Sequence, residues 1–357
     1  MTRTEYLMAQ KQKDRRLLGV FPAQYPKEIL WAMNAVPAEI WDPPMETSQA
    51  SAHLQPYICS VVKAGLNLIL EGKCHMLDGF LFPHTCDSIQ NLASMVNDYL
   101  NIQKPCYFFY HPKAPYRASS RPYYIEQLKA LITALEKAMG PMDPSRFKQS
   151  VEQGSALGAL LEKIYEQRRS GALSATGADF YRVLRQGEYL HPDDYIPKLE
   201  AFSASAGKGD RSGPAVILSG VLPNPPEILA LLDTLGARIV DDDLMNCSRR
   251  LLFHGKAVQD PFEALADAYF SLPPCTTKNS PIHKRIDTLM EKIEKTGARG
   301  VILYMVKFCE PELFDVPLIS EAVKRRGIPT LVLDVELNQG LTGQLTTRVE
   351  AFVEMIS

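Results

Sequence analysis

The stretch LDGFLFPHTCDSIQNLASMVNDYL, residues 77–100, contains the unit from which the fold is predicted. Its apolar run at 77–84 is typical of a buried strand, and the helical spacing of 86–100 follows at once. Cys86 lies at the junction, and Cys309 lies at a similar one in GVILYMVKFCEPE, residues 300–312. Ligands of open parallel sheets bind outside the carboxyl ends of the strands. Two thiols brought there by two strands therefore predict a shared site.

Strand-like and helix-like runs alternate on both sides of this stretch, which predicts parallel sheets with helices on both faces. Besides the helix at 86–100, helices are expected at 26–35 and 56–72. The strands are expected at 16–23, 77–84, 105–112, 215–221, 237–242, 300–306 and 329–335.

The predicted fold class is α/β, with two doubly wound (Rossmann-like or flavodoxin-like) parallel-sheet domains and a helical insert. We expect an N-terminal α/β domain at 1–118, a helical connecting segment at 119–207 and a C-terminal α/β domain at 208–357. The strand signal disappears over the middle segment, and the small, glycine-rich stretch at 203–214 is typical of a linker.

Composition excludes several classes of protein. The 357 residues are 46% hydrophobic and 22% charged, and the net charge of −2 gives no electrostatic argument for nucleic acid or an anionic membrane. No apolar run reaches the roughly 18–20 residues that span a bilayer. The polar N-terminus has no signal-peptide core, so we expect a cytoplasmic protein whose seven cysteines are thiols or metal ligands.

The sequence has no glycine-rich loop of the GxGxxG or GxxxxGK[ST] kind. There is accordingly no argument for a nicotinamide site or a nucleotide-hydrolysing loop. It also has no HExxH, GxSxG or CxxC motif, which removes the usual signatures of zinc proteases, serine hydrolases and thioredoxins.

Three cysteines lie near expected helix starts: Cys86, Cys309, and Cys59 after Pro56. Helix N-termini favour negative ligands such as a metal-bound thiolate. The alternative for any one of them is a small buried thiol at a tight turn, but three in the same context favour a shared cluster site.

The other cysteines are assigned by their place relative to the strands. Cys275 and Cys247 lie in loops from which they could line the site. Cys74 precedes a strand and Cys106 begins one, so we expect these two to be structural.

Each polar side chain near a strand end could have either a functional or a purely structural role. Asp241, Asp242 and Asp243 could be general acids, general bases or magnesium ligands, but a solvated turn with a helix cap is preferred for at least two of them. His84 could donate to a cluster sulfur or a substrate carbonyl, and Lys307 could meet a phosphorylated or thioester ligand. A turn histidine and a surface lysine are the alternatives.

Five segments in order resemble one known family. The resemblance lies in YICSVVKAG (57–65), LDGFLFPHTCDS (77–88), GVILYMVKFCEP (300–311), GIPTLVLDVE (327–336) and GQLTTRVEAFVE (343–354). Together they resemble the 2-hydroxyacyl-CoA dehydratase and benzoyl-CoA reductase family, specifically its cluster-bearing subunits of the D-component or B/C type.

The resemblance implies a [4Fe–4S] cluster held by Cys59, Cys86 and Cys309, with one iron open to ligands. It implies pairing with a homologous cluster subunit or with a second copy, and a separate ATP-dependent iron–sulfur activator that supplies a low-potential electron. The implied reaction is anaerobic radical dehydration of a 2-hydroxyacyl-CoA or reduction of an aromatic acyl-CoA, with His84 and Lys307 as catalytic candidates.

Three other functions stay open. A related branch carries an [8Fe–9S] double cubane and reduces small molecules, which would recruit further cysteines such as Cys275 and Cys247. A subunit that only relays electrons is a second alternative. A cluster-free α/β binding protein with ordinary core thiols is the third.

Overall fold

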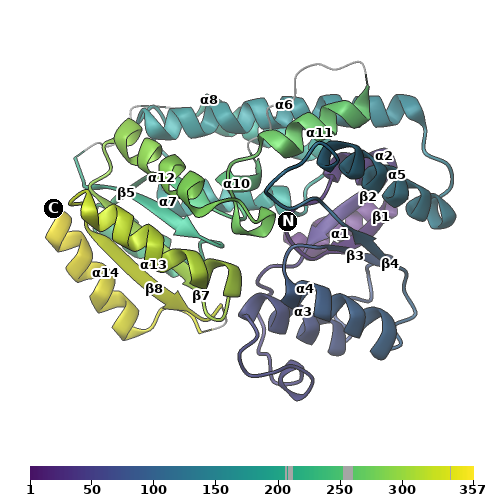
Figure 1. The fold of residues 1–357 in the computed structure, drawn as a ribbon, viewed down its shortest axis with the longest axis horizontal. Helices are drawn as coiled ribbons and strands as arrows, with labels where there is room; N and C mark the ends of the chain where they lie inside the picture. The colour runs from purple at the N-terminus through teal and green to yellow at the C-terminus, as the bar shows by residue number, and fades with distance from the viewer. Residues whose placement is uncertain (206, 208–211, 252–259, 338) are drawn as a thin grey trace. The chain divides into compact units, whose positions relative to one another are not determined.

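The computed structural model describes residues 1–205, 207, 212–251, 260–337 and 339–357 (Figure 1). The chain divides into two compact units, each assembled from three separate stretches. Unit 1 comprises Met1–Ala159, Gln186–Ile196 and Phe253–Leu272, and unit 2 comprises Leu160–Arg185, Pro197–Leu252 and Pro273–Ser357. The division into contiguous domains at 1–118, 119–207 and 208–357 stays a prediction.

Unit 1 is built on a four-stranded, all-parallel sheet of order β2-β1-β3-β4. Its strands are β1 (Arg16–Val20), β2 (Ala35–Glu39), β3 (Gly79–Pro83) and β4 (Cys106–Phe109). The helices wholly within this unit are α1 (Arg3–Gln12), α2 (Lys27–Ala32), α3 (Ser60–Leu70), α4 (Asp87–Ser94), α5 (Ser120–Met139) and α11 (Pro261–Ser271), with short turns η1 (Ala50–Ala52), η2 (Met95–Tyr99) and η3 (Gln186–Glu188).

Unit 2 repeats this plan with a parallel sheet of order β6-β5-β7-β8. Its strands are β5 (Ala215–Gly220), β6 (Arg238–Leu244), β7 (Gly300–Val306) and β8 (Thr330–Val335). Its helices are α7 (Gly177–Arg185), α9 (Glu227–Thr234), α10 (Ser248–Leu251), α12 (Ile282–Thr296), α13 (Glu310–Arg325) and α14 (Gly343–Ile356), with the short η4 (Thr276–Lys278). Helices α6 (Pro144–Arg169) and α8 (Pro192–Ala204) each contain a boundary between the units.

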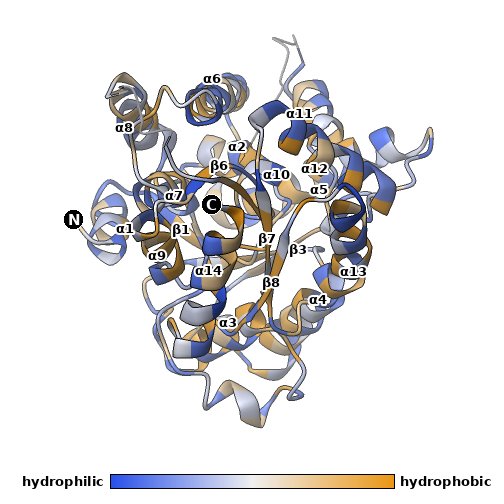
Figure 2. Ribbon diagram, turned by 90° about the vertical axis from the view of Figure 1, so that its left-hand side faces the viewer, coloured by the Kyte–Doolittle hydropathy of each residue, from blue (hydrophilic) through white to orange (hydrophobic). Residues whose placement is uncertain are grey.

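The two sheets confirm the predicted α/β fold class, and no strand occurs among the described residues of 119–207. Every residue of β7 is buried, as expected for a strand covered by helices on both faces. In Figure 2 such strands are hydrophobic, whereas helices such as α13 carry both colours. The core of unit 1 joins its strands to α2, α5 and α11, and that of unit 2 joins its strands to α12 and α13.

Strand β2 is absent from the predicted strands, because its sequence AVPAE contains Pro37 and begins at the last residue of the expected helix at 26–35. The strand order places β2 at the edge of the sheet. An edge strand can contain proline because the missing backbone N–H is not needed by a neighbouring strand on its outer side. The helix before it ends earlier than expected, at Ala32, with Asn34 at a φ of 54° turning the chain into the strand.

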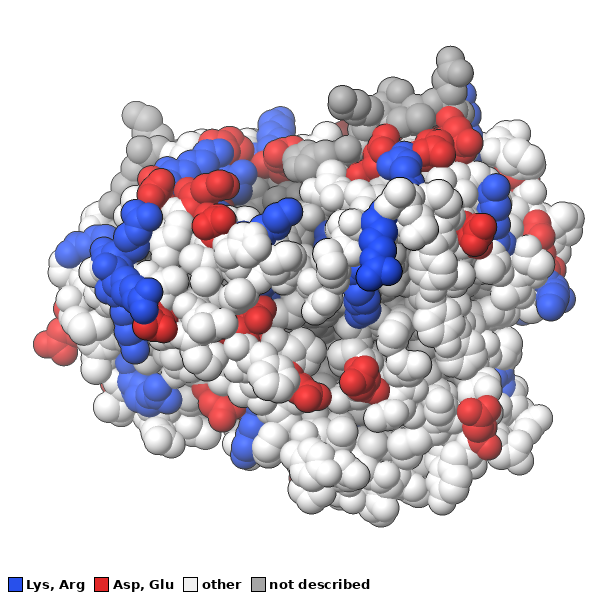
Figure 3. Space-filling model, viewed as in Figure 1, with Lys and Arg blue, Asp and Glu red and all other residues white. Residues whose placement is uncertain are grey.

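Charged side chains of both signs lie scattered among uncharged ones on the face shown in Figure 3, with neither sign forming a broad patch. This mixture accords with the net charge of −2. Among the described residues, no helix has both the length and the apolar composition needed to cross a membrane.

Candidate functional site

The matching strand orders put a switch point at the same place in both sheets. In unit 1, strand β1 has β2 as its neighbour on one side and β3 on the other. In unit 2, strand β5 has β6 on one side and β7 on the other. Crevices for ligands form where such neighbouring strands diverge, outside their carboxyl ends. Cys86 follows β3 and Cys309 follows β7, so the two thiols occupy topologically equivalent positions.

All three cysteines of the predicted ligand set are helix N-cap residues. Cys59 precedes α3, Cys86 precedes α4 and Cys309 precedes α13. The side chains of Cys59 and Cys86 make no capping hydrogen bond as thiols. First-turn backbone amides, those of Val61 and Val62 for Cys59 and of Ser88 and Ile89 for Cys86, nevertheless favour the thiolate forms of the two sulfurs. This position places each sulfur at the positive end of a helix dipole, which suits a thiolate that ligates a metal.

Within unit 1, the Cys59 and Cys86 thiols lie close enough to affect one another's ionisation, and α3 packs beside α4. Burial, and then the neighbouring Cys86, raise the pKa of Cys59 to about 12, while the amides of Val61 and Val62 oppose this. Burial likewise raises the pKa of Cys86. Both thiols therefore hold their protons near neutral pH, and a metal that binds here must displace them.

The structure shows no disulfide among the seven cysteines, all of which lie in the described part of the chain. It also contains no cluster of three or more His, Cys, Asp or Glu side chains within the described ranges that could already hold a metal ion. Cys309 belongs to unit 2, and its convergence with Cys59 and Cys86 on one cluster stays a prediction.

The remaining cysteines lie at other places in the sheets. Cys74 is buried ahead of β3 and Cys106 is the first residue of β4, both at the amino side of their strands. Cys247 and Cys275 are fully buried in unit 2, and the Cys275 sulfur lies 3.1 Å from the Thr277 hydroxyl.

The three consecutive acids do not form a solvated turn, and that preferred interpretation is wrong. Asp241, Asp242 and Asp243 lie inside β6 and are all buried. Burial is possible because each carboxylate has partners that are distant in sequence and therefore gave no local signal. Arg169 and Lys292 contact Asp241 at 3.2 Å, whereas the hydroxyls of Tyr165 and Tyr181 donate to Asp242.

Asp243 is part of a buried ion network that reaches the helix after Cys309. Arg249 binds both oxygens of Asp243, at 2.8 and 3.0 Å, and its third nitrogen binds Glu312 in the first turn of α13. Arg285 contacts the same two acids at 3.3 Å and Asp315 at 2.6 Å. This network therefore fixes the start of α13, where Cys309 is the N-cap.

The two catalytic candidates are partly buried side chains in different units. The His84 ring packs edge-on against Tyr110, and burial, followed by the charge of Lys113, lowers its pKa, so the imidazole is neutral at pH 7. Lys307, just after β7, pairs with Glu336 at 2.6 Å and lies over the Phe308 ring. The catalytic roles of His84 and Lys307 stay predictions.

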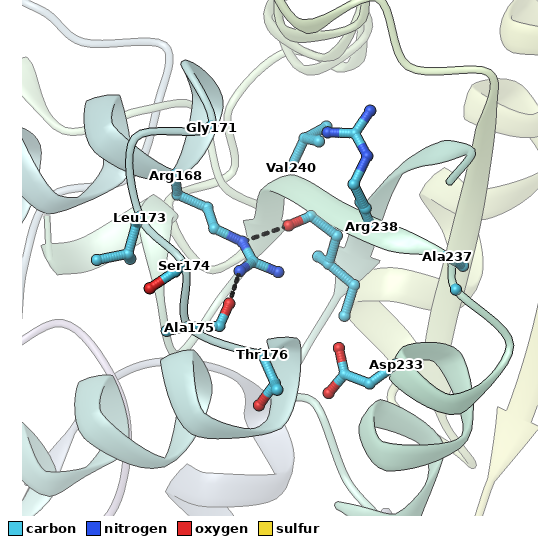
Figure 4. A pocket seen from close by; sticks show the side chains of 12 residues that line it. Arg168, Gly171, Leu173, Ser174, Ala175, Thr176, Asp233, Ala237, Arg238 and Val240 are labelled. Carbon is cyan, nitrogen blue, oxygen red and sulfur yellow. Dashed lines mark hydrogen bonds between the residues drawn. The ribbon is translucent and has the colours of Figure 1, made fainter. Parts of the chain in front are cut away.

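A cavity of about 190 Å³ in unit 2 lies away from the cysteine edge (Figure 4). It is at the amino end of β6, because Arg238 opens that strand. The Arg168 guanidinium donates to the carbonyls of Ile239, at 2.5 Å, and Ala175. Figure 4 shows Arg168 pointing towards Ala175. Asp233 accepts two amides at the start of α7, so the polar groups here brace a loop against the strand.

Comparison with known proteins assigns the chain to a family over nearly its whole length. The model of the family "2-hydroxyglutaryl-CoA dehydratase, D-component" matches residues 22–356. The (R)-phenyllactyl-CoA dehydratase beta subunit of Clostridium sporogenes is 25% identical over 99% of this chain and 95% of its own length.

Two further relatives are named for a dehydratase and for a reductase. The (R)-2-hydroxyglutaryl-CoA dehydratase subunit beta of Acidaminococcus fermentans is 24% identical over 97% of this chain and 94% of its own. A subunit of the benzoyl-CoA reductase of Thauera aromatica is 24% identical over 96% and 91%, respectively. All three relatives are named as subunits.

Proposed function

The chain belongs to the 2-hydroxyglutaryl-CoA dehydratase D-component family and is an enzyme subunit of the dehydratase or reductase kind, and we propose that it is an iron–sulfur subunit that acts on an acyl-CoA thioester. The reaction proposed is dehydration of a 2-hydroxyacyl-CoA or reduction of an aromatic acyl-CoA. The observation that carries the proposal is the equivalent placement of Cys86 and Cys309 at the switch points of two like sheets.

The proposed ligands are Cys59, Cys86 and Cys309, on one [4Fe–4S] cluster. Their chemistry fits the group: three thiols, each at a helix start, with Cys59 and Cys86 close enough to interact. A cluster bound by three thiolates supplies one-electron transfer and a Lewis-acidic iron with an open position.

The protein's own residues have three tasks in this proposal. The helix N-termini stabilise the thiolates that form when Cys59 and Cys86 lose their protons, because the dipoles offset part of the burial cost. Burial keeps bulk water from the Cys59 sulfur, whereas Cys86 and Cys309 are partly exposed. His84, two residues before Cys86 and neutral at pH 7, is proposed to donate a hydrogen bond to the substrate carbonyl, and Lys307 to contact the thioester ligand's anionic part.

Iron and sulfide analysis after anaerobic purification tests the ligand set. We expect about four irons per chain in the wild type. Serine at Cys59, Cys86 or Cys309 should abolish or sharply reduce iron binding. Cys74→Ser and Cys106→Ser are matched controls, because these cysteines lie at the amino side of strands, and they should retain full iron.

Other outcomes of the same analysis are equally informative. About eight irons, lost on Cys247→Ser or Cys275→Ser, would favour the double cubane and a small-molecule reductase. An iron-free, well-folded protein would contradict the proposal and favour a cluster-free binding protein.

Partners are also part of the proposal, supported by relatives that are named as subunits. We propose a second cluster subunit, homologous or identical, and an ATP-dependent iron–sulfur activator, because this chain has no nucleotide loop of its own. The test is an anaerobic assay with 2-hydroxyacyl-CoA and aryl-CoA thioesters, with and without activator and ATP. Sustained turnover by this chain alone with a mild reductant would show that the activator-driven mechanism does not apply.

A further inference from the structure

A lysine is anchored beside the backbone that carries Cys86. The Lys113 ammonium donates to the carbonyl of Thr85, the residue before Cys86, at 2.8 Å. Thr85 is buried, and its hydroxyl donates to the Pro22 carbonyl and accepts from the Ala23 amide. The carbonyl that holds the ammonium is thus itself fixed between the loops that follow β1 and β3.

A second lysine has the same relation to Cys59. The Lys63 ammonium donates to the Pro56 carbonyl at 2.7 Å, which holds it over the turn that leads into Cys59. Lys63 lies one helical turn after Cys59 in α3. Both lysines and both cysteines belong to unit 1.

Both ammonium groups are held close to the backbone that carries the two thiols. Lys113 binds the carbonyl of the residue directly before Cys86, and Lys63 binds a carbonyl three residues before Cys59. Asp87, in the first turn of α4, is a charge of opposite sign beside Cys86. Neighbouring Cα atoms are about 3.8 Å apart and one helical turn rises about 5.4 Å. Both cations therefore lie at the short range, within roughly 8–10 Å, at which charges are not fully screened.

We propose that Lys63 and Lys113 are electrostatic tuning residues that raise the reduction potential of the group bound by Cys59 and Cys86. This inference rests on the proposed function. Reduction adds one negative charge to the bound cluster, and a nearby fixed cation stabilises the reduced form more than the oxidised form. Removing either cation should therefore shift the midpoint potential to more negative values, and removing both should shift it further.

The test is an anaerobic redox titration of the purified full-length chain, followed by electron paramagnetic resonance of the reduced cluster. The variants are Lys113→Met, Lys63→Met and the double variant. Lys113→Arg keeps the charge and should keep a near-wild-type potential. Iron content and thermal unfolding are measured alongside, so that a change in potential is compared only between fully loaded, folded proteins.

Lys104 provides a matched control. Its ammonium also binds backbone carbonyls, including that of Cys74 at 3.1 Å, and it belongs to the same unit. It lies at the amino side of the strands, beside a cysteine outside the proposed ligand set. Lys104→Met removes an equal charge and should leave the potential within error of the wild type.

The outcomes separate this inference from the function on which it rests. An iron-free wild type would overturn the proposed function and this inference with it. A loaded wild type whose potential is unchanged in Lys113→Met and Lys63→Met would overturn the inference alone, as would an equal shift in Lys104→Met. If Lys113→Met fails to fold, Lys113→Gln and Lys63→Met carry the same test.

Discussion

Replacing Arg249 with methionine should destabilise unit 2 by about 3–5 kcal/mol, because it leaves two buried carboxylates short of a cation. Arg249 is fully buried, binds Asp243 through two nitrogens and binds Glu312 through the third. After the substitution, Arg285 at 3.3 Å from each acid is the one cation among the described residues that pairs with both.

The ionisation of Asp243 depends on the same two arginines. Burial opposes the charged form, but Arg249 and then Arg285 outweigh it and lower the pKa from 3.8 to about 2. A difference of nearly two pKa units corresponds to about 2–3 kcal/mol. Because the folded-state pKa is depressed, this stability is present above about pH 4 and is lost as pH falls towards 2. The difference in free energy of unfolding between wild type and Arg249→Met should therefore become smaller as pH falls from about 4 to 2.

The assay must report on unit 2. Both tryptophans, Trp31 and Trp41, belong to unit 1, so their fluorescence serves only as an internal reference. We would follow urea unfolding by circular dichroism, together with hydrogen exchange of peptides from β6 and α13. Peptides of β6 and α13 should lose protection in Arg249→Met while the tryptophan signal changes little.

Arg325 supplies the control, since its pair with Glu321 is largely exposed on α13. Arg325→Met should cost no more than about 0.5 kcal/mol. The reasoning fails if Arg249→Met is no less stable than this control. Adding Asp243→Asn to Arg249→Met should recover part of the loss, because it removes one of the orphaned charges.

Other consequences can be measured in the same way. Gly220→Ala should destabilise by about 2–4 kcal/mol in urea unfolding, because a Cβ there would lie 1.9 Å from the Tyr304 carbonyl at a φ of 147°; Gly297→Ala, with open space around it, should cost only about 1 kcal/mol. Burial raises the pKa of Glu28 to about 7, so the contribution of this residue to the free energy of unfolding falls as pH rises from 4.5 to 7. Glu28→Gln should accordingly be more stable than the wild type above pH 7 and not below pH 4. Thr342→Ala should lower stability by about 1 kcal/mol, as it removes the N-cap of α14, and an unchanged melting curve would contradict that role.

The local sequence pattern was sufficient to predict most strands of the two sheets. Continuous apolar runs such as GVILYMV identify strands buried on both faces, and β7 has the expected bounds, Gly300–Val306. Cys86 and Cys309 could be placed at helix starts because a strand end, a thiol and a helical run follow one another directly. Strand β2 could not be found, since Pro37 argues against a strand unless the edge position is already known.

Long-range partners explain what the sequence could not predict. Three successive aspartates are locally typical of a polar turn, and their burial depends on Arg169, Arg285 and Lys292, which distant helices bring to them. Lys113 is similar, because it lies 28 residues along the chain from Thr85, whose carbonyl it binds, and nothing in its own sequence neighbourhood marks it out. Position in the fold, not local composition, gives these cations their partners.

The interleaving of the two units affects how the protein is made on the ribosome. The last strand of unit 1 ends at Phe109, but α11, whose Leu265 and Tyr269 complete its core, is synthesised only by residue 271. At about 5–20 residues per second this interval lasts roughly 8–30 s. During it the nascent chain carries an apolar surface on α5 that α11 will later cover, while parts of unit 2 also emerge. Truncated chains that end before residue 261 should therefore aggregate or be held by chaperones, although they contain every strand of the first sheet.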